Sequence, residues 1–153
     1  MLEDVRHEIE DMHRFFVDWF NDSGMPDEAF DARFAARLAA DYGMIVPSGD
    51  CLTRDQVADW IRNAKGARPG HRIEIRDVHI LPASTARLIL ARYEEWQAAP
   101  DSRSALIATV ALQPEGPGRL DSGERASPGG YLWRHVHETA LPDARIAADP
   151  FDF

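Results

Sequence analysis

The sequence predicts an α+β fold in which three amino-terminal helices pack on a curved, mostly antiparallel β-sheet. Apolar residues recur at helical spacing through most of the first 64 residues, and at strand-like spacing through most of the rest. No helix separates the strand-like segments, so they are expected to pair as antiparallel neighbours. The 153 residues suit one domain, predicted to span 1–153 with its core in 5–141.

The first segment has the spacing of an amphipathic helix. Its apolar side chains recur at steps of three and four and form one stripe: Leu2, Val5, Ile9, Met12, Phe16, Trp19 and Phe20. The other side is acidic, and residues 1–31 carry 10 acidic and 2 basic side chains. Most of the net charge of −9 is therefore expected on a solvated helix face and the turn after it, where it favours solubility.

A second, shorter helix is expected to begin near Pro26, a residue that suits a first helical turn. Phe30, Phe34 and Leu38 recur every four residues and form a narrow apolar seam along it.

A short strand at 41–46 and a third helix are expected next. Thr53 followed three residues later by Gln56 is the pattern of a capping box, which begins a helix. Gly66 is expected to end it.

Four strands complete the fold, and each is rich in β-branched and aromatic residues. They are predicted at 72–81, 87–97, 104–113 and 131–141. In the first of them the apolar phase slips at Asp77, which indicates a bulge or a strand covered on both faces. A long Gly- and Pro-rich link spans 114–130, and a short polar tail spans 142–153.

The strands at 87–97 and 104–113 carry apolar residues on both faces rather than alternating apolar with polar residues. Both faces of the sheet are therefore expected to be covered. Three helices of this length cover one face, so the sequence predicts a homodimer through the other sheet face.

The composition excludes several functional classes. The excess of acidic over basic residues argues against nucleic-acid binding, which needs clustered Lys and Arg. The single Cys51 excludes an internal disulfide and a Cys-based zinc site. No segment approaches the roughly 20 apolar residues of a membrane span, and the first residues do not form a secretory signal. The expected location is the cytoplasm, and 16 Arg against one Lys is typical of a GC-rich bacterial genome.

The order of elements and two local strings resemble the nuclear transport factor 2-like superfamily, a cystatin-like α+β cone, and within it the SnoaL-like branch. One string is MIVPSG at 44–49 with LTRDQ at 52–56, and the other is WRHVHET at 133–139. The resemblance implies a pocket between the concave sheet face and the helices. The superfamily includes isomerases, cyclases, dehydratases, epoxide hydrolases and pure interaction domains, so the fold alone does not define a function.

The candidate catalytic residues are His135, His137 and Tyr42. The two histidines are two apart on a predicted strand and should emerge on one face with Trp133. Two imidazoles there are suited to acid and base roles near neutral pH, and they are too few for a metal site, so none is predicted. The alternative is that they are packed sheet histidines. Tyr42 lies on the short strand, a position that often reaches the pocket in proteins that resemble this one.

The candidate ligand-contacting residues are aromatic or basic side chains expected near this pocket: Trp133, Trp60, Phe16, Trp19, Arg92 and His79. Helical spacing explains the aromatic ones equally well as core. His13 borders the apolar stripe of the first helix, where it either faces a cavity or is partly exposed.

The strand at 87–97 carries further candidates. Arg92, Glu94 and Trp96 lie on one face of it, and Tyr93 and Glu95 lie on the other. A carboxylate beside an aromatic ring in a closed cleft is suited to act as a general base. The alternative is a surface network between Arg92 and Glu94.

Together these observations predict a protein that binds a small organic molecule in a pocket between sheet and helices. Any catalysis is expected to be acid–base chemistry of the isomerase, cyclase or dehydratase type, without a cofactor. The alternative hypothesis is a non-enzymatic dimerisation or protein-interaction domain.

Overall fold

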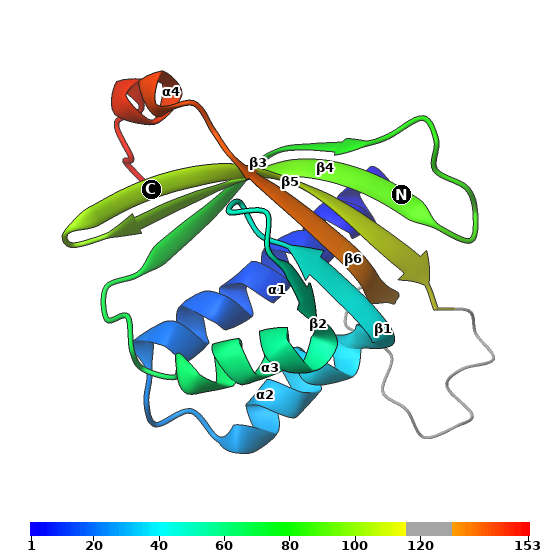
Figure 1. Ribbon diagram of the computed structural model, residues 1–153, viewed down its shortest axis with the longest axis horizontal. Coiled ribbons are helices and arrows are strands. Elements are labelled where there is room, and N and C mark those ends of the chain that lie inside the picture. Colours follow the sequence, from blue (N-terminus) through cyan, green and yellow to red (C-terminus); the bar gives the residue numbers. More distant parts are fainter. Residues whose placement is uncertain (116–129) are drawn as a thin grey trace.

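The computed structural model describes residues 1–115 and 130–153, and in it three helices cover one face of a strongly curved sheet (Figure 1). The helices and strands of this described part are α1 (Leu2–Asn21), α2 (Asp27–Arg33), a 3-10 turn (Ala35–Arg37), β1 (Leu38–Ile45), β2 (Cys51–Thr53), α3 (Arg54–Asn63), β3 (Arg72–Ile80), β4 (Ile89–Ala99), β5 (Ser102–Pro114), β6 (Tyr131–Ala140) and α4 (Asp143–Ala148). The predicted α+β fold class is confirmed.

The strands of the described residues form one six-stranded sheet in the order β2-β1-β6-β5-β4-β3. All neighbouring strands are antiparallel except β1 and β6, which pair in parallel. The four long predicted strands are present, with ends shifted by one or two residues. β2 and α4 were not predicted from the sequence. Most of the predicted link at 114–130 lies outside the described residues.

The second helix is shorter than its apolar spacing predicted. It ends at Arg33, and Leu38 opens β1 instead of completing the helical seam. Leu38 pairs with Trp133 of β6, so a sheet contact distant in sequence overrides the local helical pattern. Phe34 and Leu38 are nevertheless both buried, as the seam implied.

The capping box predicted for the third helix is confirmed. Thr53 Oγ1 accepts from the backbone N–H of Gln56 at 3.3 Å, and Gln56 Oε1 accepts from the backbone N–H of Thr53 at 2.9 Å. These reciprocal bonds satisfy two backbone donors that a helix start leaves unpaired.

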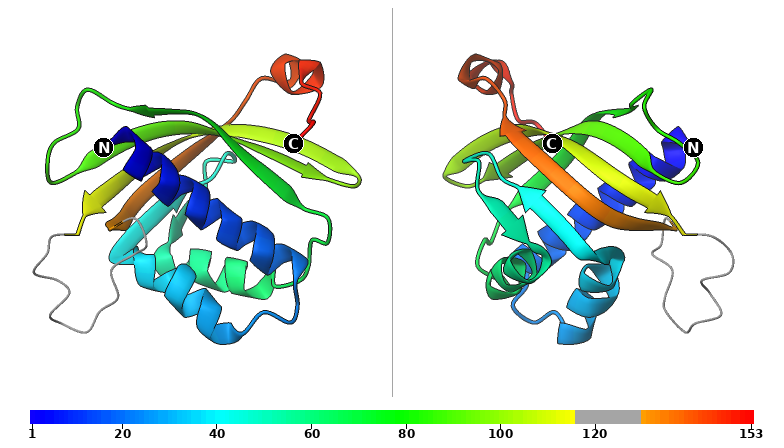
Figure 2. Two further views of the ribbon diagram at one scale, coloured as in Figure 1. Left: turned by 180° about the vertical axis from the view of Figure 1, so that it is seen from behind. Right: turned by 45° about the vertical axis from the view of Figure 1, so that its right-hand side comes forward.

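The core lies between the three helices and the concave sheet face, as two further views show (Figure 2). Aromatic rings of α1 and α2 interlock there, with the Phe15 and Phe34 rings stacked at 5.8 Å between centroids. Trp19 is fully buried among them, and its indole N–H donates to the Ile61 carbonyl at 2.8 Å. No helix in the described part of the chain is long and apolar enough to cross a membrane.

The outer sheet face is covered in part by the chain's own tail. α4 and the residues after it lie on the side of the sheet opposite α1–α3 (Figure 1), where the Phe151 ring meets the buried Trp96 ring at 5.4 Å between centroids. Arg76 stacks on the same indole at 4.4 Å from its centroid. The tail therefore provides part of the cover that the sequence attributed to a second copy, and the homodimer stays a prediction.

The predicted irregularity at Asp77 is a β-bulge. The β3–β4 register shifts between Arg76 and His79, and Asp77 has a φ of 52°. The extra residue changes the strand's phase, which is the slip that the apolar pattern indicated.

The loop between α3 and β3 is held closely against the end of α1. The backbone N–H of Gly66 donates to the Trp19 carbonyl at 2.8 Å, and that of Arg68 donates to the Phe20 carbonyl at 2.9 Å. A Cβ on Gly66 would lie 2.6 Å from Ser23 Cβ, and the glycine has a φ of +63°. Only glycine therefore fits this approach without displacing backbone.

We expect Gly66→Ala to reduce the free energy of unfolding by about 2–4 kcal/mol, because it combines left-handed strain with overlap against Ser23. Gly49→Ala is the matched control, since Gly49 has a φ of +92° but nothing within 4 Å of its would-be Cβ. Gly49→Ala should reduce the free energy of unfolding by about 1 kcal/mol, which is the cost of the left-handed backbone strain alone. Urea unfolding measures both, and equal losses would contradict the close approach.

Candidate functional site

A cavity of about 100 Å³ lies between the helices and the concave sheet face. Most of its wall is apolar, contributed by α1, α3, β1 and β6 among others: Met12, Phe16, Phe20, Phe34, Leu38, Met44, Val57, Trp60, Ile61, Ile73, Trp133 and Val136. Trp60 is 45% exposed and Arg68, also part of the wall, is exposed. The cavity therefore reaches the surface beside α3 and the loop that follows it.

A buried histidine–carboxylate pair forms one polar part of the wall. His13 Nδ1 lies 2.7 Å from the Ile9 carbonyl, and His13 Nε2 lies 3.0 Å from Glu95 Oε2. A carbonyl oxygen only accepts, so Nδ1 carries a proton. The second contact also needs a proton, which makes the pair either an imidazolium with a carboxylate or a neutral imidazole with a carboxylic acid.

The surroundings of His13 favour its charged form. Burial lowers the pKa of His13, but the negative charge of Glu95, its hydrogen bond and the Ile9 carbonyl together raise it by more. The net pKa lies above the ordinary histidine value, which favours the imidazolium–carboxylate form of the pair.

The Glu95 carboxylate is further held by its neighbour on the same strand face. Gln97 Nε2 donates to Glu95 Oε1 at 2.5 Å, while Oε2 bonds His13. Tyr93 packs its ring edge-on against His13 at 5.4 Å between centroids. Both carboxylate oxygens and the imidazole are thus held in fixed positions.

Glu138 is a second carboxyl group in the cavity wall. It faces Ala108 of β5, which in turn faces Tyr93 of β4, so the small Ala108 leaves room between the two larger groups. Burial, with the negative charge of Glu95 second, raises the pKa of Glu138 to about 8. This pKa favours the protonated carboxyl group at pH 7, and within the described residues its O–H has no hydrogen-bond acceptor.

Two phenols complete the polar wall. Burial and the nearby carboxylates raise the pKa of both Tyr42 and Tyr93 above the ordinary tyrosine value. Both hydroxyls therefore stay protonated and can donate hydrogen bonds.

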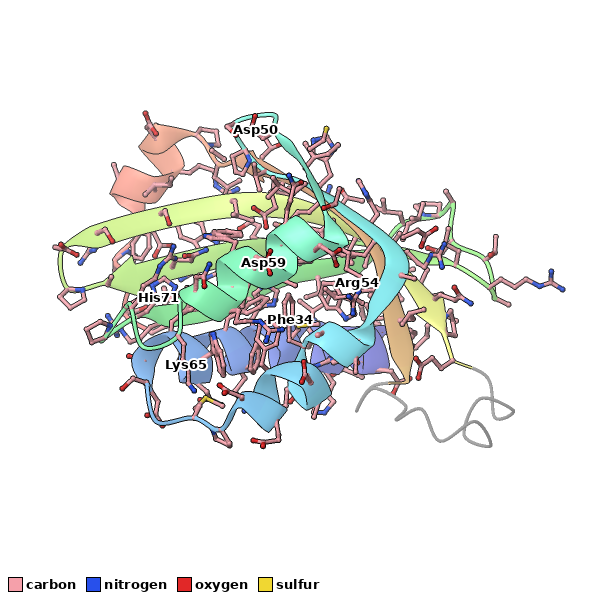
Figure 3. The ribbon with its side chains drawn as sticks, turned by 60° about the horizontal axis from the view of Figure 1, so that its bottom comes forward. Phe34, Asp50, Arg54, Asp59, Lys65 and His71 are labelled. Atoms are coloured by element: carbon pink, nitrogen blue, oxygen red, sulfur yellow. The ribbon has the colours of Figure 1, made fainter. Side chains whose placement is uncertain are left out.

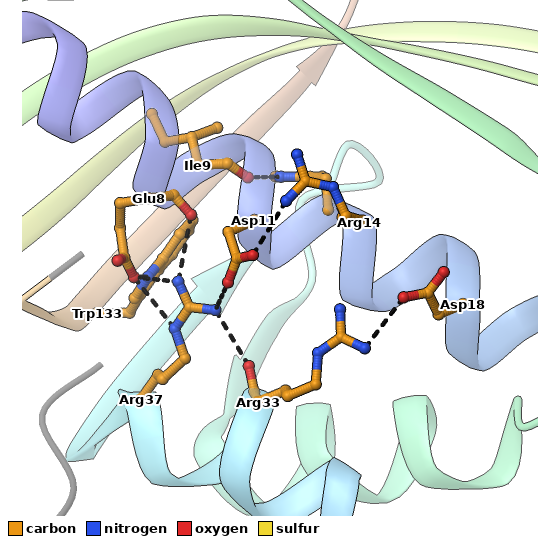
Figure 4. Close-up of polar contacts among 9 residues, drawn as sticks. Glu8, Ile9, Asp11, Arg14, Asp18, Arg33, Arg37 and Trp133 are labelled. Atoms are coloured by element: carbon orange, nitrogen blue, oxygen red, sulfur yellow. Dashed lines mark hydrogen bonds and ion pairs between the residues drawn. The ribbon is translucent and has the colours of Figure 1, made fainter. Parts of the chain in front are cut away.

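Beside the cavity, a buried ion pair positions Trp133 (Figure 4). Arg37 is 1% exposed and Glu8 is fully buried, and the guanidinium donates to Glu8 Oε1 through both Nε and Nη2. Arg37 also bonds Asp11 Oδ2 at 3.1 Å. The Trp133 indole N–H donates to Glu8 Oε1 at 2.8 Å, which orients the ring in the cavity wall.

His135 and His137 lie outside the cavity, and the prediction that they share a face with Trp133 is wrong. The register shifts from Ala111 opposite His135 to Leu112 opposite Trp133, so Arg134 is an extra residue. This bulge inverts the strand's phase. Trp133 lines the cavity, while both histidines are exposed on the outer sheet face.

Three further candidates also lie away from the cavity. Arg92 and His79 face each other on β4 and β3 and are exposed, because Arg92 alternates with the cavity-facing Tyr93. Trp19 is buried in the aromatic core and does not line the cavity. The expected Arg92–Glu94 network is also absent, since Glu94 pairs with Arg145 at 2.7 Å.

The structure brings four predicted residues together in the cavity wall: Tyr42, Trp133, Trp60 and Phe16. Among the acidic and histidine side chains of the wall, the sequence indicated His13 and Glu95 without including them in the predicted catalytic set, and it did not indicate Glu138. The position of His13 beside the apolar stripe and the shared face of Glu95 and Tyr93 were available signals. Glu138 had none, because the bulge at Arg134 sets its face.

The described residues contain no group of three or more His, Cys, Asp or Glu side chains that could hold a metal ion.

Comparison with solved structures gives several matches. A protein of unknown function from Pseudomonas aeruginosa, described as NTF-2 like, shares 32% identity over 91% of this chain and 99% of its own, with a TM-score of 0.76. An NTF2-like protein from Streptomyces avermitilis, proposed to be a dehydratase, shares 13% identity over 92% of this chain and 96% of its own, with a TM-score of 0.65.

A third match is a proposed calcium/calmodulin-dependent protein kinase type II association domain from Thiobacillus denitrificans. It shares 22% identity over 74% of this chain and 83% of its own, with a TM-score of 0.54, and so shows a common fold alone. No protein-family model matches the chain, and no curated protein matches it significantly.

Proposed function

The chain belongs to the NTF2-like family, and we propose that it binds a small organic molecule in the cavity and transfers a proton on it. The observation that carries the proposal is the pairing of His13 with Glu95 beside the neutral Glu138 in an otherwise apolar wall. Titratable groups with shifted pKa values in a largely apolar cavity are typical of acid–base sites.

The cavity volume limits the part of the molecule that enters it. An engineered apolar cavity of about 150 Å³ binds benzene, so the cavity of about 100 Å³ suits a body no larger than one small ring. Phe16, Trp60 and Trp133 supply the apolar surface for this ring, and Tyr42 supplies a hydroxyl donor.

The polar groups suit proton transfer at carbon. Glu95, as a carboxylate beside the His13 imidazolium, takes a proton from a carbon next to a carbonyl group. Glu138 donates a hydrogen bond, or its proton, to the oxygen on which negative charge develops. The same arrangement serves an isomerisation or the loss of water, and the proposed dehydratase among the structural neighbours is consistent with it.

We also propose that the chain belongs to the SnoaL-like branch of the family, that it comes from a bacterium and that it is located in the cytoplasm. The proposal also includes a homodimer through the outer sheet face, supported by the partly buried apolar residues that the tail leaves uncovered, such as Leu90 and Ala111. His135 and His137 have no role in the proposed reaction.

Filling the cavity should abolish binding. Val136 lines it and Val78 does not, although they are 3% and 4% exposed. We expect Val136→Phe to lose all molecules that co-purify with the wild-type protein in native mass spectrometry, and to weaken binding of one-ring probes at least about 10-fold in ligand-observed NMR. Val78→Phe, which adds the same atoms outside the cavity, should retain binding. Loss of binding in both variants, or in neither, would contradict the proposal.

A further inference from the structure

A groove of about 640 Å³ adjoins the cavity, formed by the loop between α3 and β3 and by the turn between β4 and β5. Arg68 and Gln97 line both the groove and the cavity, so the two spaces share a wall. Gln97 also holds Glu95, which joins the groove to the proposed reacting pair.

The loop that carries the groove residues is fixed by Asn21 at the end of α1. Asn21 Nδ2 donates to the His71 carbonyl at 2.9 Å, and Asn21 Oδ1 accepts from the backbone N–H of Gly70 at 2.6 Å. With the backbone bonds at Gly66 and Arg68, these contacts organise the loop before any ligand arrives.

Two side chains of this loop have unused hydrogen-bonding groups. The Arg68 guanidinium makes no ion pair or hydrogen bond with any described residue and lies over the Phe20 ring, 5.0 Å from its centroid. His71, beyond the end of α3 (Figure 3), is 6% exposed, and its Nε2 has no hydrogen-bond partner within the described residues. A buried polar atom without a partner is uncommon, and a ligand is one way to satisfy it.

The charges around these groups favour an anion. Both side chains line the groove. Burial, with the positive charge of Arg68 second, lowers the pKa of His71, which favours the neutral imidazole. The Glu95 carboxylate is already bonded to His13 and Gln97. The described groove residues include one carboxylate, Asp101, in the turn at the other side.

Resting on the proposed function, we propose that the molecule bound in the cavity carries a carboxylate, which passes the cavity mouth and binds Arg68 and His71 in the groove. The guanidinium supplies the charge, and His71 Nε2 supplies a further hydrogen bond. The substrate class is therefore a small monocyclic or short-chain carboxylic acid whose other end reaches Glu95 and Glu138.

The test compares acids with their neutral amides as probes: benzoate with benzamide, phenylacetate with phenylacetamide, and 3-phenylpropionate with 3-phenylpropionamide. Ligand-observed NMR titration of the full chain should show at least one acid binding about 10-fold more tightly than its amide. Arg68→Gln should remove this preference, so that acid affinity falls about 10-fold more than amide affinity. Arg62→Gln is the matched control, because Arg62 is also exposed over a phenylalanine ring, at 4.5 Å, but lines neither space.

The possible outcomes distinguish the carboxylate inference from the proposed binding in the cavity. Equal affinity for acid and amide, or an equal loss for both in Arg68→Gln, would overturn the carboxylate inference while the proposed cavity binding stands. Acetate binding as tightly as the best aromatic acid would also overturn it, since the groove would then hold a free anion only. Failure of every acid and amide to bind would overturn the proposed function together with the inference.

Discussion

Replacing Arg37 with methionine is expected to lower the free energy of unfolding by about 3–5 kcal/mol, because it leaves the buried Glu8 carboxylate without its main counter-charge. Glu8 has no exposed surface, and Arg37 bonds both its carboxylate and its backbone carbonyl. The same arginine bonds Asp11, so one substitution disturbs a network that joins α1 to the start of β1. Urea unfolding monitored by circular dichroism measures the loss.

Arg33→Met is the matched control for this substitution. Arg33 bonds Asp18 at 3.0 Å, but both side chains are partly exposed, so the loss should be below about 1 kcal/mol. The double variant Glu8→Leu/Arg37→Met should recover part of the stability, since it removes both charges. Recovery will be incomplete because the Trp133 indole N–H loses its acceptor. Equal losses in Arg37→Met and Arg33→Met would contradict the role of the buried pair.

Replacing Glu95 with glutamine is expected to lower the pKa of His13. The negative charge of Glu95 is the largest influence that raises this pKa, and burial, which lowers it, remains in the variant. The pKa of Glu138 should also fall below about 8, because the Glu95 charge is the second cause of its elevation. Proton transfer should slow by roughly 100-fold or more, since the general base is lost.

The neighbouring residue provides a control of the same chemistry. Glu94→Gln alters a carboxylate that is also buried on β4 but points to the outer face and pairs with Arg145. It should leave the His13 titration unchanged. NMR titration of the His13 ring proton measures both variants. An unchanged pKa in Glu95→Gln, or an equal shift in Glu94→Gln, would contradict the proposed site.

The free energy of unfolding should also depend differently on pH in the wild type and in Glu95→Gln. In the wild type the folded-state pKa of His13 lies above its unfolded value, so its contribution is present below about pH 6.5 and is lost as pH rises through the folded pKa. In Glu95→Gln the folded pKa of His13 is lower than in the wild type, so less of this contribution is present at low pH. The difference in unfolding free energy between the two should therefore widen from pH 8 to pH 5.

Local patterns determined much of this fold. The capping box at Thr53, the four long strands and the phase slip at Asp77 all depend on interactions between residues close in sequence, which spacing reveals directly. The end of α2 and the position of Leu38 in a strand do not depend on neighbours in sequence, because the pairing of β1 with β6 determines both. Helix propensity predicts secondary structure poorly where the same residues can pair with a strand that is distant in sequence.

The sequence by itself determined the α+β class, the order of the long elements and several apolar residues of the cavity, because apolar periodicity dictates which faces are buried. Only the tertiary structure decided the chemistry of the site. One extra residue at Arg134 turned His135 and His137 outward and Glu138 inward, and His13 met Glu95 across 82 positions of sequence. A bulge reverses every side chain beyond it, and a contact between distant residues forms only after the helices pack on the sheet.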